Sequence, residues 1–218
     1  MPKIFFISGL GANELAFSKI GALDYEKIMV KWIPNVKNET LKAYAVRLVN
    51  QYKINDNDIV AGLSFGGLLA QEISNITGLQ KVILISSFRD KNDLKFPVRQ
   101  AFNTGLYRLL PPIRVPFIDT MVANVLNSGK ADSKAVLKEM IRTTDYRLMK
   151  WSLEQIANTG SNTNKSVVLH NIIGDCDRIV NLWRNDTTYV IKGGSHFMVY
   201  DRAEEISGII RQILKNEQ

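Results

Sequence analysis

One serine in this sequence stands in a setting that can make a hydroxyl nucleophilic. Residues Gly62-Leu63-Ser64-Phe65-Gly66 form a G-x-S-x-G pattern between the apolar run Ile59–Ala61 and the helical pattern Leu68–Ile76. On such a strand–turn–helix unit the hydroxyl is exposed on a strained turn, and the glycines avoid a clash across it. The helix start also directs N–H groups toward the site. We therefore predict that Ser64 is a nucleophile; the alternative is an ordinary glycine-rich turn with a capping serine.

A nucleophilic serine needs a base, and the chain has only two histidines. His170 lies inside the apolar strand pattern Val167–Ile173 and is predicted to be a core residue. His196 follows Gly193-Gly194-Ser195, between the last predicted strand and the last predicted helix. A loop at that place lies at the carboxyl edge of a parallel sheet, where ligands bind. His196 is therefore the predicted base.

An acid is expected between the serine and the histidine in chain order. It would orient the imidazole and stabilise its charged form. The segment Gly174–Val180 offers Asp175 and Asp177. Spacing alone does not separate the two, and both could instead be turn formers.

The apolar runs predict the elements that must position these residues. Strands are expected at residues 4–7, 28–33, 59–61, 82–85, 167–169 and 187–191, and helices at 40–52, 68–76 and 203–214. Strands with few polar positions, alternating with helices, predict a mainly parallel sheet with helices on both faces.

From Phe88 to Gly160 the strand pattern is interrupted. Helical periodicity replaces it at residues 98–110, 118–126, 135–141 and 146–156, with prolines at 111, 112 and 116 breaking the pattern. The sequence therefore predicts an α/β core made of residues 1–87 and 161–218, with residues 88–160 inserted as a helical cap.

The net charge of +7 comes from 28 Lys and Arg against 21 Asp and Glu, and such an excess can signal nucleic acid or an anionic membrane. Between Phe88 and Lys150 there are 12 bases and 6 acids, so the excess is concentrated there. The bases are spaced singly, which favours a solvated helical surface over a clustered phosphate footprint. We expect no nucleic-acid partner.

Other features limit the location and the chemistry. No apolar run approaches ~18 residues, so no membrane span is expected. The short apolar stretch after Lys3 lacks a small-residue cleavage site, and a single cysteine forms no internal disulfide, so we expect a cytoplasmic protein. Cys176 stands between two acids, a setting that disfavours a reactive thiolate. No His or Cys pair has metal-ligand spacing, and no phosphate-binding glycine loop is complete, so neither a metal nor a cofactor is expected.

Together these segments resemble the α/β-hydrolase superfamily over essentially the whole chain. Residues 62–66 match its G-x-S-x-G elbow, and residues 194–197 resemble its G-x-H-x segment. Residues 174–180 resemble its G-x-x-D-x-x-V segment, which places the acid on Asp177. Residues 8–11 occupy the position of its H-G-x-G oxyanion loop, with Ser8 in place of the histidine. By analogy the oxyanion is bound by the backbone N–H groups of Leu10 and Phe65.

This resemblance implies a minimal α/β-hydrolase fold that lacks the first two strands of the family and carries a helical cap. It implies a serine hydrolase that cleaves a small ester with Ser64, Asp177 and His196. Thioester cleavage, C–C bond hydrolysis, acyl transfer and a non-catalytic ligand-binding member are the alternatives, because one fold supports many chemistries. The expected partner is a small-molecule substrate, and the sequence leaves a homodimer open.

Overall fold

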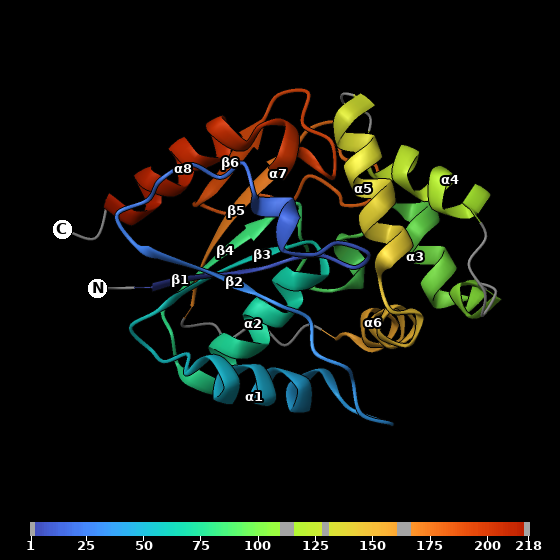
Figure 1. Cartoon of the computed structure of the whole chain (residues 1–218), viewed down its shortest axis with the longest axis horizontal. Helices are drawn as coiled ribbons and strands as arrows, with labels where there is room; N and C mark the ends of the chain where they lie inside the picture. Colours follow the sequence, from blue (N-terminus) through green and yellow to red (C-terminus); the bar gives the residue numbers. More distant parts are fainter. Residues whose placement is uncertain (1–2, 110–115, 128–130, 161–166, 216–218) are drawn as a thin grey trace.

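The computed structural model describes residues 3–109, 116–127, 131–160 and 167–215. A single six-stranded sheet lies at its centre, with strand order β2-β1-β3-β4-β5-β6 and every neighbouring pair parallel (Figure 1). The strands are β1 (Lys3–Ile7), β2 (Glu26–Val30), β3 (Ile59–Leu63), β4 (Lys81–Ile85), β5 (Val168–Gly174) and β6 (Thr188–Ile191). The predicted α/β class with a parallel sheet is confirmed.

The strand order places two loops of the predicted site next to each other. β1 pairs with β2 on one side and with β3 on the other, so the sheet changes its direction of growth between β1 and β3. In parallel sheets ligands bind outside the carboxyl ends of the strands at such a switch point. Ile7 at the end of β1 is in register with Gly62 near the end of β3. Residues 8–11 and Ser64 therefore leave the sheet at adjacent points.

Helices cover both faces of the sheet (Figure 1). One face carries α1 (Leu41–Tyr52) and α2 (Phe65–Thr77), and the other carries η1 (Glu14–Phe17), α7 (Met198–Asp201) and α8 (Ala203–Lys215). α2 begins three residues before the predicted start at Leu68. Gly66 and Gly67 look like turn residues in the sequence, but both lie in the first turn of the helix.

The predicted strand 28–33 is wrong at both ends, because β2 runs from Glu26 to Val30. Ile33 leaves the sheet and pairs with a side chain instead of a strand. The Tyr44 hydroxyl accepts a hydrogen bond from the Ile33 N–H at 3.0 Å and donates one to its carbonyl at 2.8 Å. Burial raises the pKa of Tyr44, which keeps this hydroxyl protonated and able to donate.

The described residues between β4 and β5 form helices and no strand. These are η2 (Lys91–Asp93), α3 (Phe96–Asn103), η3 (Leu106–Leu109), α4 (Pro116–Leu126), α5 (Ala131–Thr143) and α6 (Tyr146–Asn158). α3 to α6 gather at one end of the sheet, on the right of Figure 1. The predicted helix 98–110 is divided into α3 and η3, and its last residue lies outside the described part, as do Pro111 and Pro112. Pro116 begins α4 rather than breaking a helix, since its fixed φ and missing N–H suit a first helical position.

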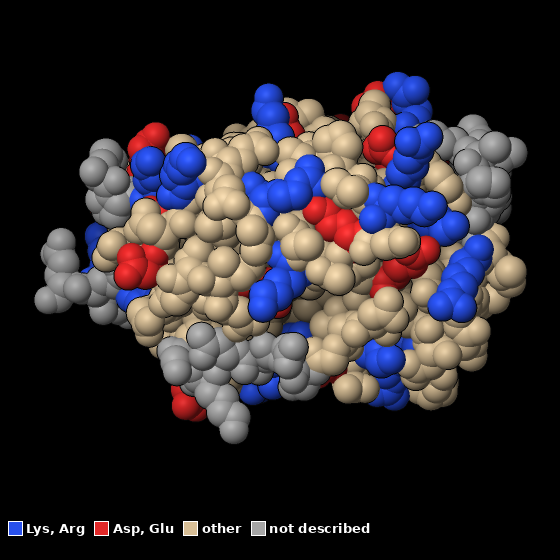
Figure 2. All heavy atoms as spheres, turned by 90° about the horizontal axis from the view of Figure 1, so that it is seen from below, with Lys and Arg blue, Asp and Glu red and all other residues tan. Residues whose placement is uncertain are grey.

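The positive charge of this helical segment faces solvent. None of its described Lys and Arg side chains between residues 88 and 150 is buried. Figure 2 shows Lys and Arg dispersed over one face of the molecule with acidic side chains among them. This distribution is that of a solvated surface.

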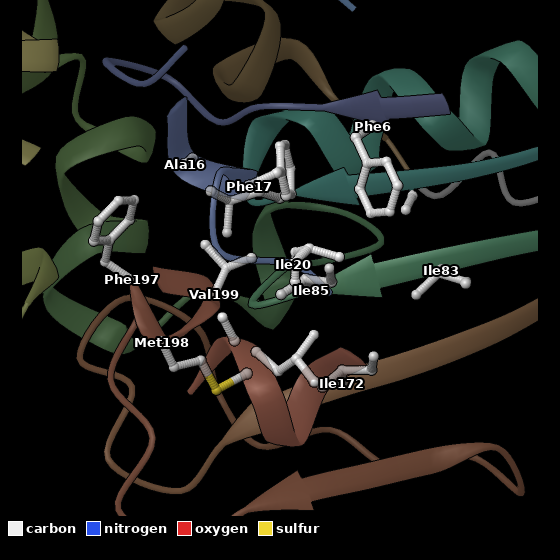
Figure 3. Close-up of a cluster of buried hydrophobic side chains, with 14 of the residues drawn as sticks. Phe6, Ala16, Phe17, Ile20, Ile83, Ile85, Ile172, Phe197, Met198 and Val199 are labelled. Atoms are coloured by element: carbon white, nitrogen blue, oxygen red, sulfur yellow. The ribbon is translucent and has the colours of Figure 1, made fainter. Parts of the chain in front are cut away.

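The hydrophobic core lies in two layers, one on each face of the sheet. The first layer brings together side chains from β1, η1, β4, β5 and α7, as the labelled residues of Figure 3 show: Phe6, Phe17, Ile85, Ile172 and Val199. α4 and α5 add four side chains to this layer, whereas α6 adds Leu148, Trp151 and Ile156 to the second. The helical segment is thus packed against both layers.

Two hydrogen bonds tie α6 to the start of α1, and in the first the Leu41 N–H donates to Gln155 Oε1 at 2.9 Å. The Trp151 indole N–H donates to the Glu39 carbonyl at 2.7 Å, and the centroid of its ring lies 4.6 Å from that of the Tyr44 ring.

Within the described ranges, no helix has the length and apolar character needed to cross a membrane.

Candidate active site

Ser64 occupies a strained turn between β3 and α2. Its φ is +51° and its ψ −119°, a conformation that costs on the order of 1–3 kcal/mol for a residue with a side chain. A Cβ on Gly62 would lie 2.3 Å from the Gly66 carbonyl oxygen, and a Cβ on Gly66 would lie 2.3 Å from the Ile7 carbonyl oxygen. Both glycines are therefore required by close backbone approach, which holds the serine against the end of β1.

The structure brings Ser64, His196 and Asp177 into one hydrogen-bonded chain. His196 Nε2 lies 2.9 Å from Ser64 Oγ, and His196 Nδ1 lies 2.8 Å from Asp177 Oδ2. Because an ionised carboxylate only accepts, Nδ1 donates its proton to Asp177. The lone pair of Nε2 then faces the serine hydroxyl, which is the orientation of a general base.

Asp177 is fixed by more than the imidazole. It is 1% exposed and His196 is 5% exposed, so their contact is shielded from water. The second carboxylate oxygen, Oδ1, accepts hydrogen bonds from the N–H groups of Ile179 at 2.8 Å and Val180 at 3.0 Å. These bonds satisfy the buried charge and hold the carboxylate in one orientation.

The other candidates of the sequence lie elsewhere. Asp175 is exposed and accepts a hydrogen bond from the Gly193 N–H at 2.6 Å. It therefore supports residues 192–197, the histidine loop, without contacting the imidazole. His170 is buried in β5 with its ring centroid 6.5 Å from that of Tyr189. Of the two acids, the structure brings only Asp177 to His196.

A second close backbone approach joins the loop that carries Asp177 to the histidine loop. A Cβ on Gly174 would lie 2.1 Å from the Gly194 carbonyl oxygen, and the Cys176 N–H donates to the same oxygen at 3.0 Å. The glycines that begin both sequence segments are thus the residues at which the loops meet.

The two proposed oxyanion donors flank the serine. Phe65 is the first residue of α2, so its N–H has no acceptor within the helix. A Cβ on Gly9, next to Leu10, would lie 3.1 Å from Ser64 Cβ. Within the described part of the chain, neither the Leu10 nor the Phe65 N–H donates to a protein acceptor. Both donors are therefore available to a ligand.

Trp32, which no sequence pattern marks as a site residue, contacts both the loop that carries Leu10 and the ring of Phe65. The Trp32 indole N–H is shared between two acceptors, Ser8 Oγ at 2.7 Å and the Ala12 carbonyl at 2.9 Å. The Trp32 ring also stacks on the Phe65 ring, with centroids 5.9 Å apart. Trp32 looks like one more apolar residue of a strand, so no spacing signal marks it. Ser8, which departs from the histidine of the resembled family, is one of its partners.

A cavity of about 270 Å³ opens above Ser64 and His196. Helices α3 to α6 supply half of its lining residues, and the walls are largely apolar, as at Phe102, Leu126 and Met149. Apart from the serine and histidine, the polar side chains that line it are Asp119 and Tyr146. No Lys or Arg among the described residues lines this cavity, so the basic charge of the helical segment does not reach a ligand inside it.

The described residues contain no group of three or more His, Cys, Asp or Glu side chains placed to hold an ion. The arrangement is instead suited to nucleophilic attack by a serine with proton transfer through a histidine.

Comparisons with known proteins bear on the fold. The sequence matches no protein-family model and no curated protein. It is similar in structure to a thermophilic esterase from Thermogutta terrifontis, with a TM-score of 0.79 at 16% identity over 99% of this chain and 90% of that one. A hydrolase from Oleispira antarctica gives 0.79 at 11% identity, over 100% and 92%. A lipase-esterase related protein from Clostridium acetobutylicum gives 0.72 at 13% identity, over 97% and 93%. The chain therefore has the α/β-hydrolase fold, as the resemblance in its sequence predicts.

Proposed function

We propose that this protein is a serine hydrolase that cleaves a small ester through an acyl-enzyme. The observation that carries the proposal is the hydrogen-bonded chain from Ser64 through His196 to Asp177, with the serine facing an apolar cavity. The esterases among the proteins of similar structure support the class by analogy of fold.

The first half of the reaction forms the acyl-enzyme. Ser64 Oγ bonds to the ester carbonyl carbon while His196 Nε2 takes the hydroxyl proton, and Asp177 stabilises the resulting imidazolium. The N–H groups of Leu10 and Phe65 bind the oxyanion, at about 3–4 kcal/mol of transition-state stabilisation per donor. The tetrahedral intermediate then breaks its C–O bond, and the leaving alcohol takes the proton from His196.

The second half regenerates the serine. Water gives a proton to His196 and bonds to the acyl carbon, and the bond to Ser64 Oγ then breaks as the proton returns to the serine. One ester and one water yield one carboxylic acid and one alcohol.

Residues 88–160 act in this proposal as a cap that forms the substrate cavity, because they supply most of its lining residues. The exposed thiol of Cys176, the single cysteine of the chain, supports a reducing, cytoplasmic environment.

Labelling by a fluorophosphonate tests the nucleophile. The unmodified protein should react at Ser64, and Ser64→Ala should not be labelled. If the intact protein stays unlabelled while a control serine hydrolase reacts, the proposal fails.

The two aspartates provide a matched pair for the acid. Asp177→Asn should lower kcat by about 10⁴-fold, because the amide no longer holds the imidazole in the tautomer that accepts the serine proton. Asp175→Asn, two residues away and outside this chain of hydrogen bonds, should leave kcat within a few-fold. Equal losses of kcat in the two variants would contradict the assignment of Asp177 as the acid.

A separate assay identifies the bond cleaved, by comparing turnover of matched esters and thioesters.

A further inference from the structure

The cavity above Ser64 contains a second carboxylate that the mechanism does not use. Asp119 on α4 is only 9% exposed and lines the cavity together with Ser64 and His196. Among the described residues it accepts no hydrogen bond and has no cation within ion-pair distance. Its oxygen atoms are not among the fully enclosed, unpartnered polar atoms of the described residues, so they open to the cavity, where a donor on a ligand can reach them.

Arg142 on α5 is the cation whose charge interacts with Asp119, but it is engaged elsewhere. Its guanidinium donates to Glu139 at 2.6 and 2.8 Å on the surface. This hydrogen bond is the main cause that raises the pKa of Arg142, and the charge of Asp119 is the smallest. Arg142 therefore does not neutralise the cavity carboxylate directly.

A structural role alone does not explain the burial of Asp119. An acid in the first turn of a helix interacts favourably with the helix dipole, and Asp119 lies in the first turn of α4. Asp132 does the same for α5 from an exposed position. The dipole thus needs no acid inside the cavity.

Along α4, Asp119 lies about two turns away from the residues that contact the neighbours of His196. The end of α4 is tied to both neighbours of His196, since Phe197 N–H donates to the Leu126 carbonyl at 3.0 Å and Ser195 Oγ bonds to Asn127 Oδ1 at 3.4 Å. Asp119 precedes Leu126 by seven residues, which is about 10 Å along the helix axis. Apolar side chains, such as Val122, line the cavity between them.

We propose that Asp119 is a specificity-determining residue that binds a hydroxyl or ammonium group at the end of an apolar substrate chain, remote from the ester. The inference rests on the proposed hydrolase function. It gives the substrate class as an ester with a hydrogen-bond donor at the end of an alkyl chain, and it excludes an anionic group at that end. The described Lys and Arg side chains of residues 88–160 do not line the cavity and have no part in this selection.

Two series of esters test the proposal, one varied at the end of the acyl chain and one at the end of the alcohol chain. Each series contains hexyl-length members that end in methyl, hydroxyl, ammonium or carboxylate. In at least one series the hydroxyl and ammonium members should have kcat/KM values about 10- to 100-fold above the methyl member, and the carboxylate member should be the poorest.

Three variants separate charge, hydrogen bonding and fold. Asp119→Asn, which is isosteric, should keep the preference for hydroxyl within a few-fold and lose the preference for ammonium. Asp119→Leu should lose both and turn over the methyl member faster. Asp132→Asn removes the first-turn acid of α5 and should leave every ratio unchanged.

If the kcat/KM ratios between the ester members are unchanged in Asp119→Leu, the inference about Asp119 is overturned. Labelling of Ser64 would still support the hydrolase function in that case. If Ser64 is not labelled and no ester is cleaved, the proposed function fails, and calorimetry then tests Asp119 directly. Tighter binding of 6-aminohexanol than of hexanol by the unmodified protein, absent in Asp119→Leu, would support the site. Equal binding of the two alcohols would overturn it.

Discussion

Gly66→Ala tests whether the close contact of the elbow with β1 holds the site together. The added Cβ would lie 2.3 Å from the Ile7 carbonyl oxygen and 2.4 Å from the Ser8 carbonyl oxygen. An ordinary contact needs more than 3 Å, so the backbone must open by roughly 1 Å. The two carbonyls belong to the backbone at the end of β1, and Gly66 belongs to the backbone of α2. Neither backbone segment can move without the rest of its element.

The cost follows from overpacking. Such forced shifts destabilise by about 1–3 kcal/mol, which lowers Tm by about 2–12 °C in a protein of this size. The loop that carries Leu10 moves with the contact, so kcat should fall by about 10²- to 10³-fold through loss of an oxyanion donor. Calorimetric unfolding and ester turnover measure the two effects.

The same substitution elsewhere in the chain gives the control. Gly208 lies exposed in α8, and the nearest atom to an added Cβ, in the Arg211 side chain, is 4.0 Å away. Gly208→Ala should stabilise by up to about 1 kcal/mol, since alanine favours a helix over glycine. If Gly66→Ala matched Gly208→Ala in Tm and kept its kcat, the close-approach argument would be refuted.

Three further substitutions test contacts described above. Trp32→Phe keeps an aromatic ring against Phe65 but removes the indole donor, so kcat should fall about tenfold with KM little changed; an unchanged kcat in steady-state assays would remove Trp32 from the positioning of the oxyanion loop. Tyr44→Phe bears on alkaline unfolding. Because burial raises the pKa of Tyr44, its contribution to stability is complete below about pH 10 and is lost as pH rises above that, so denaturant titrations should show a shallower alkaline decline in the variant. Trp151→Phe leaves the Glu39 carbonyl without its donor and should cost about 1–3 kcal/mol in urea unfolding; no change in the midpoint would mean that this hydrogen bond does not help to anchor α6.

Local patterns in the sequence were sufficient for the sheet, most helices and the positions of the site loops. Ser64, Asp177 and His196 each follow the carboxyl end of a strand, at β3, β5 and β6. A parallel sheet brings these ends to one edge, so finding the strands is enough to group the loops. Boundaries were less certain where side chains compete with the backbone, as at β2, whose predicted end at Ile33 is replaced by the bonds to Tyr44.

Tertiary structure alone decided which side chains meet. Spacing left Asp175 and Asp177 equivalent, and only the fold shows that one faces Gly193 and the other the imidazole. Trp32 reaches a loop 20 or more residues away, and Asn127 meets the histidine loop across 68 residues. Such contacts depend on side-chain direction after packing and leave no periodic signal in the chain. By itself the sequence determined a parallel α/β sheet with a sharp turn at Ser64 between a strand and a helix; the cavity, the contacts of Trp32 and the carboxylate of Asp119 in the cavity lining arise only when distant segments fold together.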